Sequence, residues 1–298
     1  MSYNLVKTGG SSIVLGIGHF KDFLKVRENK LVKVTKILEN HNEFENLGII
    51  RKIKNSKQFY SIPDEEVFML EPDQAFYKHV ERLAQYDKMN IFNGMLQFVY
   101  IDYAGNKDLL DILIDMVENR NLSIWKTYKK IETFAKHMIE AIYYLHKNQL
   151  AHLDIKPENI MIDTERDRFT LIDFGFCSKY PFNNFVNNPR GTPGYFPKFY
   201  EKEKIEPWLP KINANDLDLD ITGNYPGLID RSLIYKIDSY CLGRVLYFLK
   251  YAYDENKVYY CYNGEGKVGE RLDVIIEALG DDDVYKRISI MECFDLYF

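Results

Sequence analysis

The chain of 298 residues has few cysteines, and none stands in a pattern that binds metal or builds a disulfide framework. The four are Cys177, Cys241, Cys261 and Cys293, and no two of them form a CxxC pair. The sequence therefore predicts neither a zinc site nor a small disulfide-stabilised fold. Reduced thiols are the expected state, and a cytoplasmic location follows as a prediction.

An excess of positive charge and long apolar runs are also lacking. The formal net charge is −5, and no basic run is long enough to follow a phosphate backbone, so we expect no nucleic-acid partner. No apolar stretch approaches the roughly 18 residues of a membrane span. The first residues lack the basic and apolar runs of a signal peptide. We therefore expect no membrane partner.

What is present is the apolar content of a globular protein. The hydrophobic fraction of 46% is enough for a substantial core in one large or two small domains. The patterns predict strands over 31–34, 96–103, 160–162 and 169–172, and helices over 42–53, 131–145 and 237–251. A strand-rich first third followed by a helical remainder predicts an α+β fold with two lobes.

Two short polar segments carry the strongest chemical signal. HLDIKPEN places Asp154, Lys156 and Asn159 along one loop, and DFG presents Asp173 nineteen residues after Asp154. The two strands between these segments form a hairpin that can bring Asp173 close to Asn159. A carboxylate and an amide oxygen suit Mg²⁺, and a lysine beside a carboxylate can neutralise a phosphate while the carboxylate accepts a hydroxyl proton. Phosphoryl transfer needs these groups, because positioning and charge stabilisation supply most of its catalysis.

These two segments resemble the catalytic loop and the magnesium loop of eukaryotic-type protein kinases. The resemblance implies that Asp154 is the general base, that Lys156 contacts the γ-phosphate, and that Asn159 and Asp173 are the metal ligands. It also implies ATP and Mg²⁺ as cofactors and proteins as substrates. The alternative is a chance hairpin that carries surface carboxylates.

Three later motifs extend the resemblance. GTPGYF resembles the end of a serine/threonine kinase activation loop, which implies hydrogen bonds from Thr192 to Asp154 and Lys156. KIDSYCLG resembles the helix whose aspartate, here Asp238, braces the catalytic loop; the alternative is an ordinary helix N-cap. Arg287 resembles the arginine that pairs with the glutamate of an Ala-Pro-Glu signature. That signature is replaced by Pro-Lys-Phe at 197–199, so the glutamate is not evident, although Glu201 is a substitute.

The start of the chain carries a weaker match to the nucleotide-binding half of a kinase. KTGGSSIV resembles the glycine-rich loop, with Gly9 as its central glycine and Val14 against the adenine. A plain Gly-Gly hairpin is the alternative. Lys33 is the expected phosphate-holding lysine, because it interrupts an apolar strand where an uncompensated charge is costly.

Two choices in this half stay open. Lys36 is the alternative to Lys33. Glu43 is the expected helix partner of that lysine, with Leu47 and Ile50 following at helical spacing, and Glu45 is its alternative. A solvated helix or strand face is the further alternative for these assignments.

YIDYAGNKDL resembles the hinge of a kinase. The resemblance implies that Ile101 is the gatekeeper, that the backbone of Asp102 and Ala104 reads the adenine edge, and that Asp108 meets the ribose hydroxyls. For Asp108 the alternative is a helix N-cap.

Two departures from the family pattern lead to hypotheses. Leu153 stands where many kinases have the arginine that grips a phosphorylated activation loop, so we expect no need for that phosphorylation. The region 200–232 is longer than the family norm. Its acidic piece, residues 213–220, predicts either a contact to a basic substrate or a plain surface loop.

The sequence as a whole predicts a bilobal protein-kinase-like fold. Residues 1–103 form a β-rich small lobe with the glycine-rich loop, the strand lysine and the helix glutamate. Residues 104–298 form a helical lobe with the catalytic loop, DFG, the activation segment and an insertion at about 200–232. The predicted reaction is transfer of the ATP γ-phosphoryl group to serine or threonine hydroxyls of proteins.

The rivals are a pseudokinase scaffold, which the irregular glycine loop favours, and a small-molecule kinase, which GTPGYF disfavours because it shapes a peptide platform. The Asn- and Lys-rich composition and short chain resemble kinases carried by large DNA viruses. For such a protein the location would be the host cytoplasm or the virion.

Overall fold

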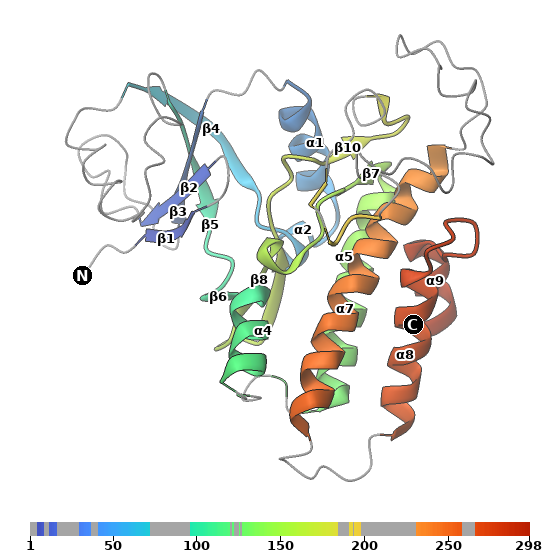
Figure 1. The fold of residues 1–298 in the computed structure, drawn as a ribbon. Helices are drawn as coiled ribbons and strands as arrows, with labels where there is room; N and C mark the ends of the chain where they lie inside the picture. Colours follow the sequence, from blue (N-terminus) through green and yellow to red (C-terminus); the bar gives the residue numbers. More distant parts are fainter. Residues whose placement is uncertain are drawn as a thin grey trace. The chain divides into compact units, whose positions relative to one another are not determined.

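The computed structural model describes residues 5–8, 12–16, 30–36, 41–71, 96–119, 121, 125, 127–183, 191–192, 194–197, 231–257 and 266–298, which include all the strands and helices that the sequence predicts (Figure 1). It divides the chain into two compact units. The first comprises Met1–His41 and Ser61–Tyr103, and the second comprises Asn42–Tyr60 and Ala104–Phe298. Gly9 and most of the region 200–232 lie outside the described residues.

The first unit contains an antiparallel sheet of five described strands in the order β1-β2-β3-β5-β4. These strands are β1 (Leu5–Thr8), β2 (Ser12–Gly16), β3 (Lys30–Lys36), β4 (Pro63–Leu70) and β5 (Leu96–Asp102). Along β3, Val32 and Val34 are fully buried and pair in register with Tyr100 and Phe98. Lys33 lies between them and points to the other face, because strand side chains alternate.

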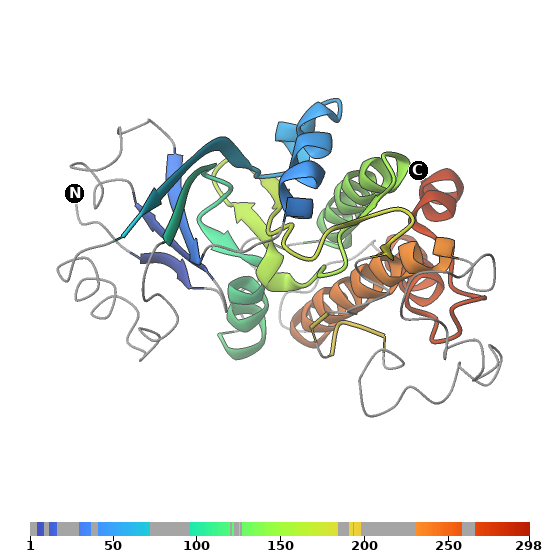
Figure 2. The same cartoon turned by 90° about the horizontal axis from the view of Figure 1, so that it is seen from above.

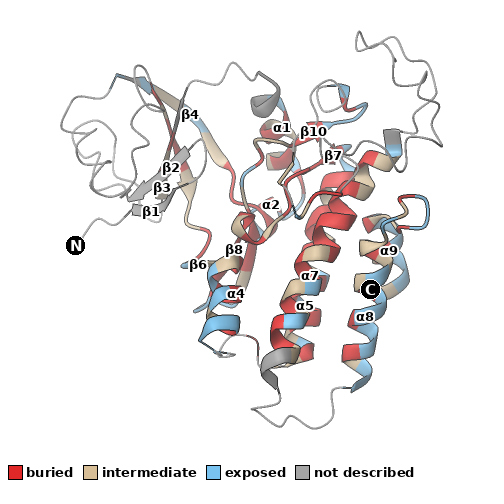
Figure 3. Cartoon of the chain, viewed as in Figure 1, coloured by how far each residue is buried: buried red, intermediate tan, exposed pale blue. Residues whose placement is uncertain are grey.

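The second unit is built around helices, with α5 (Tyr128–Lys147), α7 (Tyr235–Lys257), α8 (Gly266–Gly280) and α9 (Ile290–Tyr297) packed against one another (Figure 2). Buried residues line the facing sides of α5 and α7 (Figure 3). A Cβ on Gly243 of α7 would lie 2.8 Å from the backbone nitrogen of Gly280. Gly243 therefore permits a close crossing of α7 and α8, which a larger residue would push apart.

Short elements connect these helices. They are α2 (Ser56–Phe59), β6 (Lys107–Asp108), α4 (Leu109–Glu118), β7 (Leu150–Ala151), η3 (Pro157–Asn159), β8 (Ile160–Asp163), β9 (Arg168–Leu171), β10 (Ser178–Lys179) and η7 (Arg231–Ile234). Strands β8 and β9 form the predicted antiparallel hairpin, and β6 pairs with β8. The predicted strands and helices are all confirmed, with ends that shift by a few residues.

The assignment of helix α1 (His41–Lys52) differs from the predicted lobes. Residues 42–60 belong to the second unit, whereas the sequence placed them in the small lobe. The reason is a set of contacts to the rest of the second unit: Asn46 Nδ2 donates to the backbone oxygen of Cys177 at 2.9 Å, and Tyr60 Oη donates to the backbone oxygen of Ala141 at 2.5 Å. Among the described residues, no helix is both long and apolar enough to cross a membrane.

Candidate active site

Asp154 is the centre of a cluster of polar contacts in the second unit. Thr192 Oγ1 donates to Asp154 Oδ1 at 2.6 Å and accepts a hydrogen bond from Lys156 Nζ at 2.8 Å. Lys156 Nζ also lies 2.8 Å from Asp154 Oδ2. The predicted contacts of Thr192 are confirmed. Gly191 permits this arrangement, because a Cβ at that position would overlap the ring of Phe196.

Asn159 ends the loop that contains Asp154, which we call the Asp154 loop (residues 152–159). Its Nδ2 donates to the backbone oxygen of Asp154 at 2.8 Å and to Asp154 Oδ2 at 2.9 Å. Both donor hydrogens of the amide are thus directed at Asp154. These two hydrogen bonds do not use the amide oxygen of Asn159, which is the atom that the predicted metal-binding role requires.

Asp173 begins a second loop, the Asp173 loop (residues 173–175), shortly after β9. The backbone N–H of Ile172 donates to the backbone oxygen of Asn159 at 2.9 Å, so the two loops lie side by side as the hairpin predicted. Asp173 itself is exposed and has a left-handed φ of 62°. A cation or a phosphate-bound metal can therefore reach its carboxylate from solvent.

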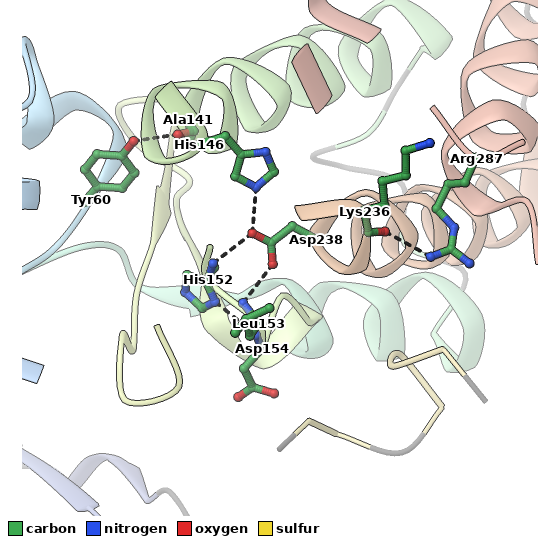
Figure 4. A network of polar contacts seen from close by, with 9 residues as sticks. All are labelled: Tyr60, Ala141, His146, His152, Leu153, Asp154, Lys236, Asp238 and Arg287. Atoms are coloured by element: carbon green, nitrogen blue, oxygen red, sulfur yellow. Dashed lines mark hydrogen bonds and ion pairs between the residues drawn. The ribbon is translucent and has the colours of Figure 1, made fainter. Parts of the chain in front are cut away.

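Aromatic rings pack against Phe174 of the Asp173 loop. The buried ring of Phe174 lies 5.1 Å from the His152 ring and 5.7 Å from the Tyr60 ring, the second in an edge-to-face arrangement. Tyr60 is fixed by its hydrogen bond to Ala141 of α5, and burial raises its pKa well above the usual range (Figure 4). His152 Nε2 lies 3.2 Å from the backbone oxygen of Ile172.

Asp238 braces the Asp154 loop from α7, as predicted (Figure 4). Its carboxylate is fully buried and accepts from the backbone N–H groups of His152 and Leu153, each at 2.8 Å. His146 Nε2, at the end of α5, lies 2.9 Å from the same carboxylate, which can only accept, so the ring donates through Nε2. One buried carboxylate therefore joins α5, α7 and the loop.

Leu153 is buried and has a φ of 65°, a left-handed backbone that is uncommon for a leucine. Such a conformation costs about 1 to 2 kcal/mol. The hydrogen bond from its N–H to Asp238 holds it. Asp238 thus fixes the turn immediately before Asp154.

Arg287 is fully buried near the start of α7. Its Nε donates to the backbone oxygen of Asp281 at 2.8 Å and its Nη1 to that of Lys236 at 3.1 Å, and the guanidinium lies over the Tyr240 ring. Burial lowers the pKa of Arg287 to about 10. Glu201, its predicted substitute partner, lies outside the described residues.

Two of the predicted nucleotide-binding side chains, those of Val14 and Glu43, lie outside the described residues, as does that of Lys36. In β3, Lys33 is half-buried and opposite Val14 in register. The alternative glutamate, Glu45, forms an ion pair with Lys179 of β10 at 3.0 Å. The choices between Lys33 and Lys36 and between Glu43 and Glu45 stay predictions.

The hinge prediction falls on the end of β5. Asp102 forms an ion pair with Lys30 at 2.8 Å, and its backbone oxygen accepts from Ser61 Oγ at 2.9 Å. Burial lowers the pKa of Lys30, but hydrogen bonds to Asp102 and Asp64 outweigh burial and raise it overall. The roles of Asp102, of Ile101 on the same strand and of the buried Ala104 stay predictions.

Asp108 is the N-cap of α4 and accepts from the backbone N–H of Asp111 at 2.9 Å. The N-cap alternative is therefore confirmed for Asp108. Its role at the ribose stays a prediction.

Sequence reasoning did not find three of these supporting residues. His146, Tyr60 and Lys30 all act through contacts distant in sequence, at separations of 92, 81 and 34 residues. The placement of His146 at the end of a helix, six residues before the Asp154 loop, was the only usable signal.

The fold and this cluster define a class of protein. An antiparallel sheet unit, a helical unit, and two carboxylates, a lysine and an amide on two adjoining loops are the parts of a protein phosphotransferase. The family model described as protein kinase domain matches residues 25–199, more than half of the chain, and the chain belongs to that family. It therefore carries a protein kinase domain.

Two curated relatives show the same class. The chain is 31% identical over 141 residues to the serine/threonine-protein kinase chk-2 of Caenorhabditis elegans, a match that covers 45% of this chain and 27% of that protein. It is 29% identical over 137 residues to the carbon catabolite-derepressing protein kinase of Candida glabrata, covering 44% of this chain and 21% of that protein. The matches thus span about a quarter of the length of these relatives.

Proposed function

We propose that this protein transfers the γ-phosphoryl group of ATP to serine and threonine hydroxyls of protein substrates. The observation that carries the proposal is the bridge of Thr192 between Asp154 and Lys156. The bridge ties the segment that would hold a peptide to both residues that would handle the transferred group. Family membership supports the same activity.

Each residue of the cluster has a task in this reaction. Asp154 accepts the proton of the substrate hydroxyl. The hydroxyl oxygen bonds to the γ-phosphorus while the bond from that phosphorus to the β-phosphate oxygen breaks. Lys156 lies 2.8 Å from Asp154 and stabilises the negative charge of the group in transit. Thr192 keeps both side chains in place.

Asn159 and Asp173 fit Mg²⁺, because their oxygens are hard ligands and a backbone hydrogen bond joins their loops. The described residues contain no group of three His, Cys, Asp or Glu side chains that could hold a metal ion alone. Phosphate oxygens of ATP would complete the coordination, and the metal would neutralise their charge. The residues proposed to hold ATP are Gly9, Val14, Lys33, Glu43, Ile101, Asp102, Ala104 and Asp108.

Location and origin are proposals that rest on the sequence. The cysteine pattern supports a cytoplasmic location. The composition supports a kinase of a large DNA virus, which would act in the host cytoplasm or in the virion. The suggestion of basic substrates depends on residues 213–220, which lie outside the described residues, and it stays a prediction.

Radiolabelled ATP with a mixed protein substrate tests the proposal. Wild type should label serine and threonine, and Asp154→Asn should reduce the rate by about 10²-fold or more while leaving the melting temperature close to wild type. Binding of ATP without any transfer would favour the scaffold alternative. Transfer to a small metabolite in place of protein would favour the small-molecule kinase.

A further inference from the structure

Three cations around α7 differ in what holds them. Lys250 lies 2.7 Å from Asp254 and 2.9 Å from Asp273, so two carboxylates neutralise it. Arg287 donates to backbone oxygens. Arg244 differs from both: within the described part of the chain, its buried Nε has no hydrogen-bond acceptor.

Among the described residues, aromatic rings contact the guanidinium of Arg244. Its guanidinium carbon lies 4.9 Å from the centre of the Phe248 ring and 5.5 Å from that of the Tyr247 ring. The residue is half-buried, and Tyr247 is 45% exposed. Rings that orient a guanidinium and shield it from water strengthen its attraction for an anion.

This cation adjoins the catalytic cluster. The ring of Tyr195 lies 5.8 Å from that of Phe248, and the backbone N–H of Tyr195 donates to the backbone oxygen of Thr192 at 3.2 Å. Thr192 in turn hydrogen-bonds to Asp154. A continuous path through Thr192, Tyr195 and Phe248 therefore leads from the proposed base to Arg244.

The charges around Tyr195 are of both signs. Burial and the negative charge of Glu158 raise the pKa of Tyr195, and the positive charge of Arg244 opposes them. Glu158 follows Lys156 closely in the Asp154 loop, whereas Arg244 approaches from α7. A bound peptide would meet a negative charge on the loop side and a positive charge on the helix side.

We propose that Arg244, backed by the rings of Phe248 and Tyr247, binds an acidic side chain of the protein substrate close to the phosphoacceptor hydroxyl. This inference rests on the proposed kinase function and adds a substrate class to it. A carboxylate matches the guanidinium by charge and by its two oxygens, which accept from adjacent N–H groups. The chemistry on the helix side of Tyr195 thus selects acidic substrates.

A peptide series tests the inference. The series places one aspartate at successive positions on either side of a serine in an otherwise neutral sequence. Wild type should phosphorylate at least one aspartate peptide with a kcat/KM about tenfold above that of the neutral peptide. Arg244→Gln should abolish this preference and keep the rate on the neutral peptide. Lys250→Gln, on the same helix, is the matched control and should keep the preference.

Three results would overturn the inference: no preference in wild type, a preference that survives Arg244→Gln, or an equal loss on every peptide, which would indicate a structural role. Absence of transfer to any peptide would instead contradict the proposed function. In that case, fluorescence anisotropy of the same labelled peptides still decides the inference. Acidic peptides should bind about tenfold more tightly than the neutral one to wild type only; equal binding to wild type and Arg244→Gln would refute it.

Discussion

The Asp154 loop and the Asp173 loop adjoin each other but are held by different forces. A single buried carboxylate, Asp238, fixes the Asp154 loop through directed hydrogen bonds. Ring packing between Phe174, Tyr60 and His152 supports the Asp173 loop. Hydrogen bonds to a buried charge fail completely when the charge is removed, whereas ring packing weakens in proportion to the apolar volume that is removed. We therefore expect the position of Asp154, the proposed base, to depend on one group, and the position of Asp173, the proposed metal ligand, to change gradually as the ring packing is reduced.

The largest effect is expected when Asp238 is replaced by alanine. Two backbone N–H groups and His146 would then be buried without their acceptor, and the free energy of unfolding should fall by about 3 to 5 kcal/mol. Urea denaturation measures the change. Asp238→Asn retains one acceptor oxygen and should lose less. A loss under about 1 kcal/mol for the alanine variant would refute the view that this carboxylate holds the loop.

Tyr60→Ala should come next and should act on the Asp173 loop. Removal of the buried ring should cost about 3 kcal/mol of stability, and it should raise the Mg²⁺ concentration for half-maximal activity by loosening Phe174. Tyr60→Phe keeps the ring, loses the bond to Ala141, and should cost about 1 kcal/mol with an unchanged Mg²⁺ requirement. An unchanged Mg²⁺ requirement in both variants would show that the ring of Tyr60 does not position Asp173.

Lys30→Met, in the first unit, should give a smaller effect. Lys30 joins Asp64 and Asp102, so its loss should loosen the proposed hinge and raise the KM for ATP by about two- to fivefold. The kcat should be unchanged. Lys107→Met removes a comparable ion pair to Asp115 and serves as the control. Equal KM values for the two variants would contradict a role of Lys30 at the hinge.

The smallest effect is expected from dephosphorylation. Leu153 is a buried apolar residue, so the Asp154 loop offers no cation at that position for a phosphorylated segment. Phosphatase treatment should leave the phosphorylation rate unchanged. A protein inert without phosphorylation between residues 178 and 192 would refute the hypothesis, and intact-mass spectrometry with an activity assay decides the matter.

The fold could be predicted from the sequence where patterns are local. Alternation along β3 and β5 and the apolar face of α5 identified these elements, because periodicity reflects the face that is buried. The hairpin β8–β9 followed from the two motifs it connects. The sequence did not predict that residues 42–60 belong to the second unit. Their assignment depends on hydrogen bonds from Asn46 and Tyr60 to partners that are distant in the sequence.

The candidate site was predictable to the extent that motifs encode it. The contacts of Asp154, Lys156, Thr192 and Asp238 appear as the motifs implied. The supporting contacts of Tyr60, Lys30 and Arg244 belong to no sequence motif. A partner that is distant in the sequence cannot be identified from the residues that flank a position. Asp108 has a local role that the structure shows, the N-cap of α4, while the role that the motif implies at the ribose stays a prediction.

The position of Asp238 sets a practical lower limit on any expressed fragment. The family match ends at residue 199, and a protein cut there would retain Asp154, Asn159 and Asp173. It would also lose α7, so the left-handed turn at Leu153 would have nothing to hold it. A useful fragment for crystallisation or assay must therefore run past α7 and include Arg287, whose guanidinium ties residues 281 and 236 together.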